Sequence, residues 1–266
     1  YLHDCKFSWF SRYIVRITLR PGAGTFNSIV SSNEFIDNYT IQSDGNISGG
    51  ECIAPVRNDE GDTTWEDVNP GDSTFVFIED NYFSGQLSPV VGGWGGLYVF
   101  RHNYVERNHY HGSLNMHGGH RENGHPPTRL IEVYENTFVK APEGSVFYYE
   151  TGHGVEHDEG IIISFGGEAI VHNNVIDGYS VGMKTVVFDH DWGEPYPIEN
   201  WQAGYESGVQ YGPDHTGTDP DTYGAGDWFI WDNTWKNMEG SPKLYVQQDS
   251  DDTYIQEGRD YHFSKY

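Results

Sequence analysis

One short pattern of apolar and polar positions recurs along the chain. Its copies are "YLHDCKF" (1–7), "IVSSNEF" (29–35), "FIEDNYF" (77–83), "VFRHNYV" (99–105), "EVYENTF" (132–138), "IVHNNVI" (170–176) and "FIWDNTW" (229–235). The central residue is Cys5 in the first copy and asparagine in the others, and the positions three before it and two after it are apolar throughout. This pattern predicts two short strands joined by a bend at the central residue.

The spacing of the copies predicts a solenoid. Successive central residues are separated by 28, 48, 22, 33, 38 and 59 residues. If the interval of 48 is two turns of 24, the unit is about 22–28 residues, with loops inserted in the longer intervals. We expect asparagine at the bend because its short amide tolerates left-handed backbone angles, and because stacked asparagines can form a hydrogen-bonded ladder.

These phrases resemble the repeats of the right-handed parallel β-helix superfamily, which includes pectate lyases, polygalacturonases, alginate epimerases and phage tailspikes. The resemblance extends from Tyr1 to about Asn237. It implies one all-β domain over 1–266, with coils of about 22–28 residues and long loops on one flank. An antiparallel sandwich would also use short strands, but it does not explain a recurring asparagine. The superfamily includes enzymes and non-catalytic proteins, so the fold does not choose a function.

Composition narrows the range of expected binding partners. The chain has 266 residues with 15 Lys plus Arg against 40 Asp plus Glu, a net charge of −25. Such a surface repels phosphate backbones and anionic membranes, so nucleic acid is not an expected partner. No run approaches the ~18 apolar residues of a membrane helix, so we expect no membrane insertion. Some carboxylates are instead candidates for binding Ca²⁺.

The chain also carries weaker signals about its setting. It begins inside a copy of the phrase, which predicts a processed or trimmed N-terminus and an exposed end coil available for self-association. Cys5 and Cys52 allow one disulfide but no thiolate zinc site. The sequons at Asn38 and Asn46 favour an extracellular protein, secreted or at the cell surface.

Three long insertions carry most of the candidate chemistry: 109–127, 150–160 and 189–227. They follow their central residues at a similar phase, so we expect them to rise from one flank and wall a groove that holds an extended polymer. The long inserted loop 189–227 contains aromatic residues, of which Trp192, Trp201 and Tyr205 are candidates for stacking on sugar rings. The alternative is that these rings pack the loop against the solenoid.

The densest polar segment is "ETGHGVEHDEG" (150–160), with His153, Glu156 and Asp158 as candidate catalytic residues. Its "GHG", together with the later "GMKT" around Lys184, resembles two motifs of polygalacturonases. That resemblance implies that His153 and Lys184 position an acidic sugar.

Two features depart from the polygalacturonase pattern. That family has an arginine two residues before its lysine, where this chain has Gly182. It also has paired aspartates shortly before "GHG", where residues 137–152 contain only Glu143 and Glu150 as acids. An inverting hydrolase needs two carboxyl groups about 6.5–9.5 Å apart, one as acid and one as base.

A lyase needs a cation to neutralise a uronate and a base to remove its α-proton. Asp189, Asp191 and Glu194 are the candidate ligands for Ca²⁺. Lys184 or His190 is the candidate base.

Neighbouring copies also align charged side chains. Asp80, His102 and Glu135 should form one column, and Glu79 should lie beside Arg101. These alignments predict stabilising ladders, and Arg101 is also a candidate binder of a substrate carboxylate.

Two functions from different classes follow. The first is a secreted carbohydrate-active β-helix, a polysaccharide lyase or hydrolase. The second is a non-catalytic structural or adhesive solenoid, such as a tailspike-like module or a subunit of an extracellular assembly.

Overall fold

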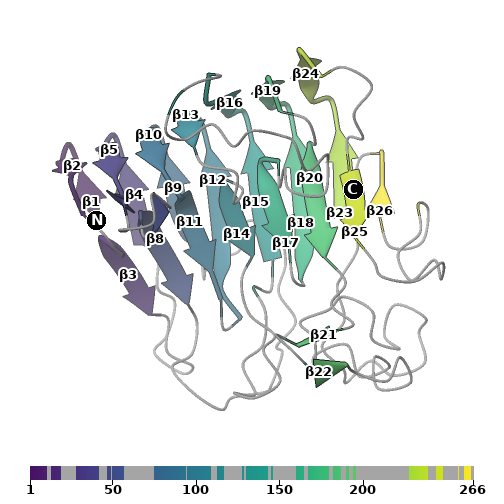
Figure 1. Ribbon diagram of the computed structural model, residues 1–266, viewed down its shortest axis with the longest axis horizontal. Coiled ribbons are helices and arrows are strands. Elements are labelled where there is room, and N and C mark those ends of the chain that lie inside the picture. The colour runs from purple at the N-terminus through teal and green to yellow at the C-terminus, as the bar shows by residue number, and fades with distance from the viewer. Residues whose placement is uncertain are drawn as a thin grey trace.

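The computed structural model describes most of the repeated phrases and only part of their connections. The described residues are 1–10, 13–18, 28–41, 47–48, 50–56, 75–93, 95–108, 113–116, 128, 130–142, 145, 160–164, 167–179, 182–186, 190–191, 194–195, 228–238, 244–247, 257 and 261–264. These residues form strands, with no helix among them (Figure 1). This part of the chain accordingly contains no helix with the length and hydropathy needed to cross a membrane.

Three parallel sheets make up the body of the protein. The first sheet contains β1 (Leu2–His3), β4 (Ser28–Ser31), β9 (Val76–Glu79), β12 (Leu97–Arg101), β15 (Leu130–Tyr134), β18 (Glu168–His172), β23 (Trp228–Trp231) and β26 (Tyr261–His262). The second contains β2 (Lys6–Ser8), β5 (Glu34–Asn38), β10 (Tyr82–Gln86), β13 (Tyr104–Asn108), β16 (Thr137–Lys140), β19 (Val175–Asp177) and β24 (Thr234–Lys236). The third contains β3 (Val15–Thr18), β8 (Glu51–Val56), β11 (Ser88–Gly92), β14 (Leu114–Met116), β17 (Ile162–Ser164), β20 (Met183–Val186) and β25 (Leu244–Gln247).

Two small antiparallel hairpins lie outside the three sheets. They are β6 (Thr40–Ile41) with β7 (Ile47–Ser48), and β21 (His190–Asp191) with β22 (Glu194–Pro195).

The chain passes through the three sheets in turn, so each coil places its strands beside those of the coils before and after it (Figure 1). The predicted all-β solenoid with parallel pairing is confirmed. The division of the 48-residue interval into two turns is wrong, because Val30 pairs directly with Ile78. That interval is one coil, which contains the hairpin β6–β7 and a long connection between β8 and β9.

The bend between the first and second sheets differs from the prediction in one detail. The left-handed residue is the one before the central position, with φ between 49° and 58°: Asp4, Ser32, Asp80, His102, Glu135, Asn173 and Asp232. The central asparagine is free of this conformation, and its side chain points inward to form a ladder.

The predicted asparagine ladder is confirmed. The Oδ1 of Asn103 accepts hydrogen bonds from the backbone N–H and the Nδ2 of Asn81, at 2.9 and 3.0 Å. Its own N–H and Nδ2 donate to Oδ1 of Asn136, at 2.9 and 3.1 Å. The Nδ2 also donates to the carbonyl oxygens of Ile78 and Arg101. The same side-chain connections run in one direction through Asn33, Asn81, Asn103, Asn136, Asn174 and Asn233.

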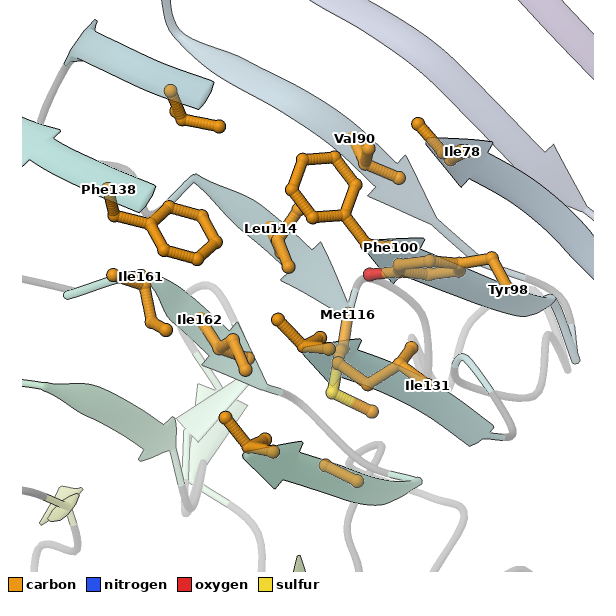
Figure 2. Packing of buried hydrophobic residues seen from close by; sticks show 14 of the residues in the cluster. Ile78, Val90, Tyr98, Phe100, Leu114, Met116, Ile131, Phe138, Ile161 and Ile162 are labelled. Atoms are coloured by element: carbon orange, nitrogen blue, oxygen red, sulfur yellow. The ribbon is translucent and has the colours of Figure 1, made fainter. Parts of the chain in front are cut away.

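Apolar side chains from the three sheets fill the interior between them. The row two residues after the central position begins with stacked rings, Phe7 on Phe35 at 5.1 Å and Phe35 on Phe83 at 4.8 Å between centroids. Figure 2 shows the middle of this core, where Phe100 of the first sheet lies near residues of the third. These rows bury the apolar positions that define the phrase, and such burial is the dominant favourable contribution to folding.

One core residue carries a polar group. Tyr98 is fully buried in the cluster drawn in Figure 2. Among the described residues, its hydroxyl has no hydrogen-bond partner. Burial raises the pKa of this phenol, so the group stays neutral. A buried hydroxyl without a partner loses its bonds to water and gains none, which destabilises the folded state.

The structure also settles two smaller expectations. Cys5 and Cys52 are both free thiols, so the possible disulfide is absent. Asn38 is buried, and its Nδ2, the atom that a glycan would join, donates to the carbonyl oxygen of Phe7 at 3.3 Å. This sequon is therefore inaccessible in the folded protein, while Asn46 lies outside the described residues.

The ladder predicts a large penalty for losing one asparagine. Asn103→Ala should lower the free energy of unfolding by at least about 3 kcal/mol, because several buried groups lose partners that are worth about 1–3 kcal/mol each. Thermal or denaturant unfolding followed by circular dichroism measures the effect. The matched control is Asn173→Gly, an exposed asparagine at a left-handed position, which should change stability by less than about 0.5 kcal/mol. Equal effects of the two variants would contradict the ladder's role.

The unpaired hydroxyl of Tyr98 predicts that its removal stabilises the protein. Tyr98→Phe removes only the unsatisfied hydroxyl and should stabilise the protein by about 1 kcal/mol. Tyr134→Phe is the control, because the Tyr134 hydroxyl accepts a hydrogen bond from Arg101 at 2.9 Å and its loss should destabilise. A lower unfolding midpoint for Tyr98→Phe would show that this hydroxyl has a stabilising partner.

Candidate functional site: the outer face of the third sheet

The connections at the three corners of the coil differ in how much their length varies from coil to coil. Each connection from the first sheet to the second has two residues, as between β12 and β13. The long connections lie at the other two corners, and both of these border the third sheet. Residues 141–161 lead into β17, and residues 57–75, 117–129 and 187–227 lead out of third-sheet strands.

The expectation that the three insertions leave from one flank is therefore wrong. Segment 150–160 precedes β17, whereas 189–227 follows β20, and β14 interrupts 109–127. The insertions leave from two opposite borders of one sheet. The strands of this sheet run side by side across the front of Figure 1, with the hairpin β21–β22 below them. Long segments at both borders are what a groove over this sheet requires.

The outward row of the third sheet forms the floor between these borders. Ile53, Val90 and Leu114 point into the main core, and the residue after each of them belongs to the opposite face. Along that face, Val91, Asn115, Ile163, Lys184 and Tyr245 are consecutive register partners. Val91 and Ile163 are each only 4% exposed, although they face away from the core. The floor is therefore covered at these positions.

Asn115 is the polar member of the described floor. The residue is partly buried, and its Oδ1 is a buried acceptor that receives no hydrogen bond from any described residue. Buried acceptors normally have a donor, so the missing hydrogen bond at this oxygen is a cost to the folded state.

Lys184 occupies the same row on β20, between Ile163 and Tyr245. The structure describes its backbone position. The segment that contains His153, Glu156 and Asp158 lies outside the described residues, but it ends at Gly160, which forms an isolated bridge with Met183. This segment therefore enters the sheet next to the strand of Lys184.

The other candidates follow β20 directly. His190 and Asp191 form β21, and Asp191 pairs with Glu194 across the hairpin. The remaining candidates in this part of the chain lie outside the described residues: Asp189, Trp192, Trp201 and Tyr205. Among the side chains that the structure describes, no group of three His, Cys, Asp or Glu is arranged to hold a metal ion.

Arg101 lies on the first sheet rather than with Lys184 on the third. Its Nε donates to Oε2 of Glu79 at 2.7 Å, and its Nη1 donates to the Tyr134 hydroxyl at 2.9 Å. Burial would lower the pKa of the guanidinium, but the hydrogen bonds with Tyr134 and Glu79 outweigh it and raise the pKa. The predicted alignment of Arg101 with Glu79 is confirmed, and this pairing occupies part of the group that would bind a substrate carboxylate.

The structure adds an aromatic ladder that the phrases did not predict. The rings of Tyr134 and His172 stack at 4.9 Å, and those of His172 and Trp231 at 4.5 Å, in the row that contains Arg101. The sequence signal was an aromatic residue two positions before the asparagine in the last three copies. Because these rings stack on one another, the two faces of His172 are unavailable to a sugar.

The predicted column of Asp80, His102 and Glu135 is only partly formed. The Nδ1 of His102 lies 3.2 Å from a carboxylate oxygen of Glu135, and both side chains are largely exposed. Exposed pairs of this kind contribute about 0–1 kcal/mol.

No family model, no curated protein and no solved structure matches the chain. The function must therefore be inferred from the chain's own residues.

The two ion pairs predict different stabilities. Glu79→Gln should lower the free energy of unfolding by about 1–3 kcal/mol, because it leaves the half-buried guanidinium of Arg101 without its counter-charge. Glu135→Gln removes the exposed partner of His102 and should cost less than about 1 kcal/mol. Both are measured by thermal unfolding at pH 7, and a larger loss for Glu135→Gln would contradict the assignment.

Proposed function

We propose that the chain is a secreted, carbohydrate-active member of the right-handed parallel β-helix superfamily, a polysaccharide lyase or hydrolase. The recurring coil and its asparagine ladder support this membership. The right-handed sense follows from the strong preference of parallel strand connections for that hand. The polysaccharide would lie beside the third sheet, between the long segments that border it.

One observation carries this proposal: long segments border the third sheet on both sides at β17 and β20, with Lys184 in the row between them. The segment with His153, Glu156 and Asp158 enters β17, and the segment with His190 and Asp191 leaves β20. Candidates that lie far apart in the sequence therefore belong to connections around the same two strands. Asn115 on β14 and Ile163 on β17 continue the row of Lys184.

In the lyase form, Lys184 or His190 removes the α-proton of a uronate. A net charge of −25 would repel such a polymer, so a cation is needed to hold its carboxylate. Asp189, Asp191 and Glu194 are the candidate ligands for Ca²⁺, which prefers carboxylate oxygens. Asp191 and Glu194 are register partners in the hairpin β21–β22. Bound Ca²⁺ would neutralise the substrate carboxylate.

In the hydrolase form, Glu156 and Asp158 supply the acid and the base, and His153 with Lys184 positions the sugar. Trp192, Trp201 and Tyr205 would supply stacking surfaces in either form. Rings with both apolar faces and polar edges suit a sugar, which presents C–H groups on its faces and hydroxyls at its rim.

The second candidate is a non-catalytic structural or adhesive solenoid. It is favoured by the pairing of described charged side chains with one another along the coils, as in Lys6 with Glu34 and Glu79 with Arg101. It is also favoured by exposed large apolar side chains, such as Trp9 at 75% exposure, because such residues suit contact with another protein.

An activity screen against acidic and neutral polysaccharides, with and without Ca²⁺, separates the candidates. The lyase form predicts growth of ultraviolet absorbance from unsaturated uronates, and the hydrolase form predicts new reducing ends without that absorbance. Lys184→Ala should reduce the rate at least about 100-fold, the lower range for loss of a general base.

The control is Lys6→Ala, which removes an exposed lysine on the second sheet and should leave the rate unchanged. Absence of turnover on every polymer, with elution as a large assembly, would exclude the enzyme and favour the structural solenoid. Equal rates for Lys184→Ala and the unmodified protein would exclude Lys184 as the base and leave His190 as the candidate.

A further inference from the structure

The corner between the second and third sheets contains buried amides of its own. Asn38 at the end of β5 and Gln86 at the end of β10 are register partners, and both are fully buried. In each case the preceding residue has a positive φ, as at the first corner. Each amide nitrogen donates to a carbonyl oxygen of the preceding coil, that of Asn38 to Phe7 at 3.3 Å and that of Gln86 to Phe35 at 2.7 Å. These amides therefore attach each coil to the one before it.

Asn38 holds together three segments of the chain. Besides the bond from its Nδ2 to Phe7, its Oδ1 accepts a hydrogen bond from the backbone N–H of Phe10 at 3.2 Å. The Sγ of buried Cys52 lies 3.9 Å from the same Nδ2. A β-carbon added at Gly50 would lie 1.9 Å from the carbonyl oxygen of Asn38, so these two backbones are in direct contact. Asn38 is 0% exposed, and no path leads from its amide nitrogen to solvent.

The same asparagine begins the sequon Asn38-Tyr39-Thr40, an acceptor sequence for N-linked glycans. In that transfer Nδ2 forms a bond to C1 of an oligosaccharide and loses a proton, while the bond from C1 to a lipid pyrophosphate breaks. A glycan is bulky and polar, so it needs an opening to solvent that the packed corner does not provide. The unfolded chain has no such restriction. The modification is therefore possible only before this corner folds.

We propose that N-glycosylation of Asn38 and folding of this corner compete for the same amide. A chain that is glycosylated first cannot turn the side chain inward, so the carbonyl of Phe7 and the N–H of Phe10 lose their partner. A chain that folds first protects the amide from modification. The folded protein accordingly carries no glycan at this sequon, and a secretory pathway that glycosylates nascent chains produces fewer folded molecules. This inference concerns another corner from the proposed polysaccharide groove and does not depend on it.

The test uses two variants of the full chain that differ only in the sequon of Asn38. Ser48→Ala removes the other sequon, at Asn46, and keeps that of Asn38. Adding Thr40→Ala removes the sequon of Asn38 without changing Asn38 itself. Thr40 and Ser48 are register partners in the hairpin β6–β7, so both changes fall at one place in the fold. Each variant, preceded by a cleavable export signal, is translated with microsomes that supply the transferase and the lipid-linked oligosaccharide.

Ser48→Ala should give two populations, which gel mobility separates and mass spectrometry assigns. After the microsomes are opened, a protease should digest the chains glycosylated at Asn38 at least about tenfold faster than the unmodified chains, because digestion follows the population of open molecules. An inhibitor of the transferase should return all chains to the slow rate. The double variant should give one population without a glycan, digested at that slow rate.

Two results would overturn the proposal. Equal rates of digestion for glycosylated and unmodified chains of Ser48→Ala would show that the corner folds with a glycan on Asn38. Absence of a glycan at Asn38 in this variant would show that the two events do not compete. Neither result depends on the outcome of the polysaccharide screen.

Discussion

The asparagine ladder is the constraint on which the rest of the structure depends. Each side-chain amide oxygen accepts from the preceding coil, and each amide nitrogen donates to the next asparagine and to a backbone carbonyl of the preceding coil. The side chain must therefore lie inward at one corner, with a fixed separation between coils. The corner can then contain only two residues, of which the first adopts the left-handed conformation. The first sheet remains in register across the described coils. The second sheet does so next to the ladder and shifts register only later, between Glu106 and Asn108. The long connections lie at the two borders of the third sheet.

The sequence predicted the features that depend on this ladder. Asparagine spacing gave the parallel pairing, the apolar rows and the alignment of Glu79 with Arg101. The prediction from sequence was wrong for features that the asparagine spacing does not determine. An interval of 48 fits either two short coils or one long coil, and only the direct pairing of Val30 with Ile78 distinguishes them. The left-handed residue was assigned to asparagine on propensity, but the inward amide overrides that preference and shifts it to the preceding residue.

The candidate site was harder to predict, because the third sheet has no recurring marker. Its outward row contains Val91, Asn115, Ile163 and Lys184, which share no residue type, so no phrase reveals their register. The strands of the third sheet are short, such as β17 with three residues and β20 with four. The distance of an insertion from the nearest asparagine therefore cannot show whether the insertion comes before or after the third-sheet strand of its coil. The hydrogen bond from Tyr82 on β10 to Glu106 on β13 was missed for another reason: it joins positions that differ by two along neighbouring strands, whereas the repeated phrases relate only directly aligned positions.

The direction of the ladder has an electrostatic consequence. From Asn33 to Asn174, every Nδ2 donates toward the coil that follows it in the sequence. The amide dipoles are therefore parallel, and each bond polarises the next. Their sum is a small macroscopic dipole along the solenoid axis, with its positive end toward Asn233. In an α-helix the positive end of the dipole is the N-terminal one. The dipole of the asparagine ladder has the opposite direction relative to the chain, with its positive end toward the C-terminal coil.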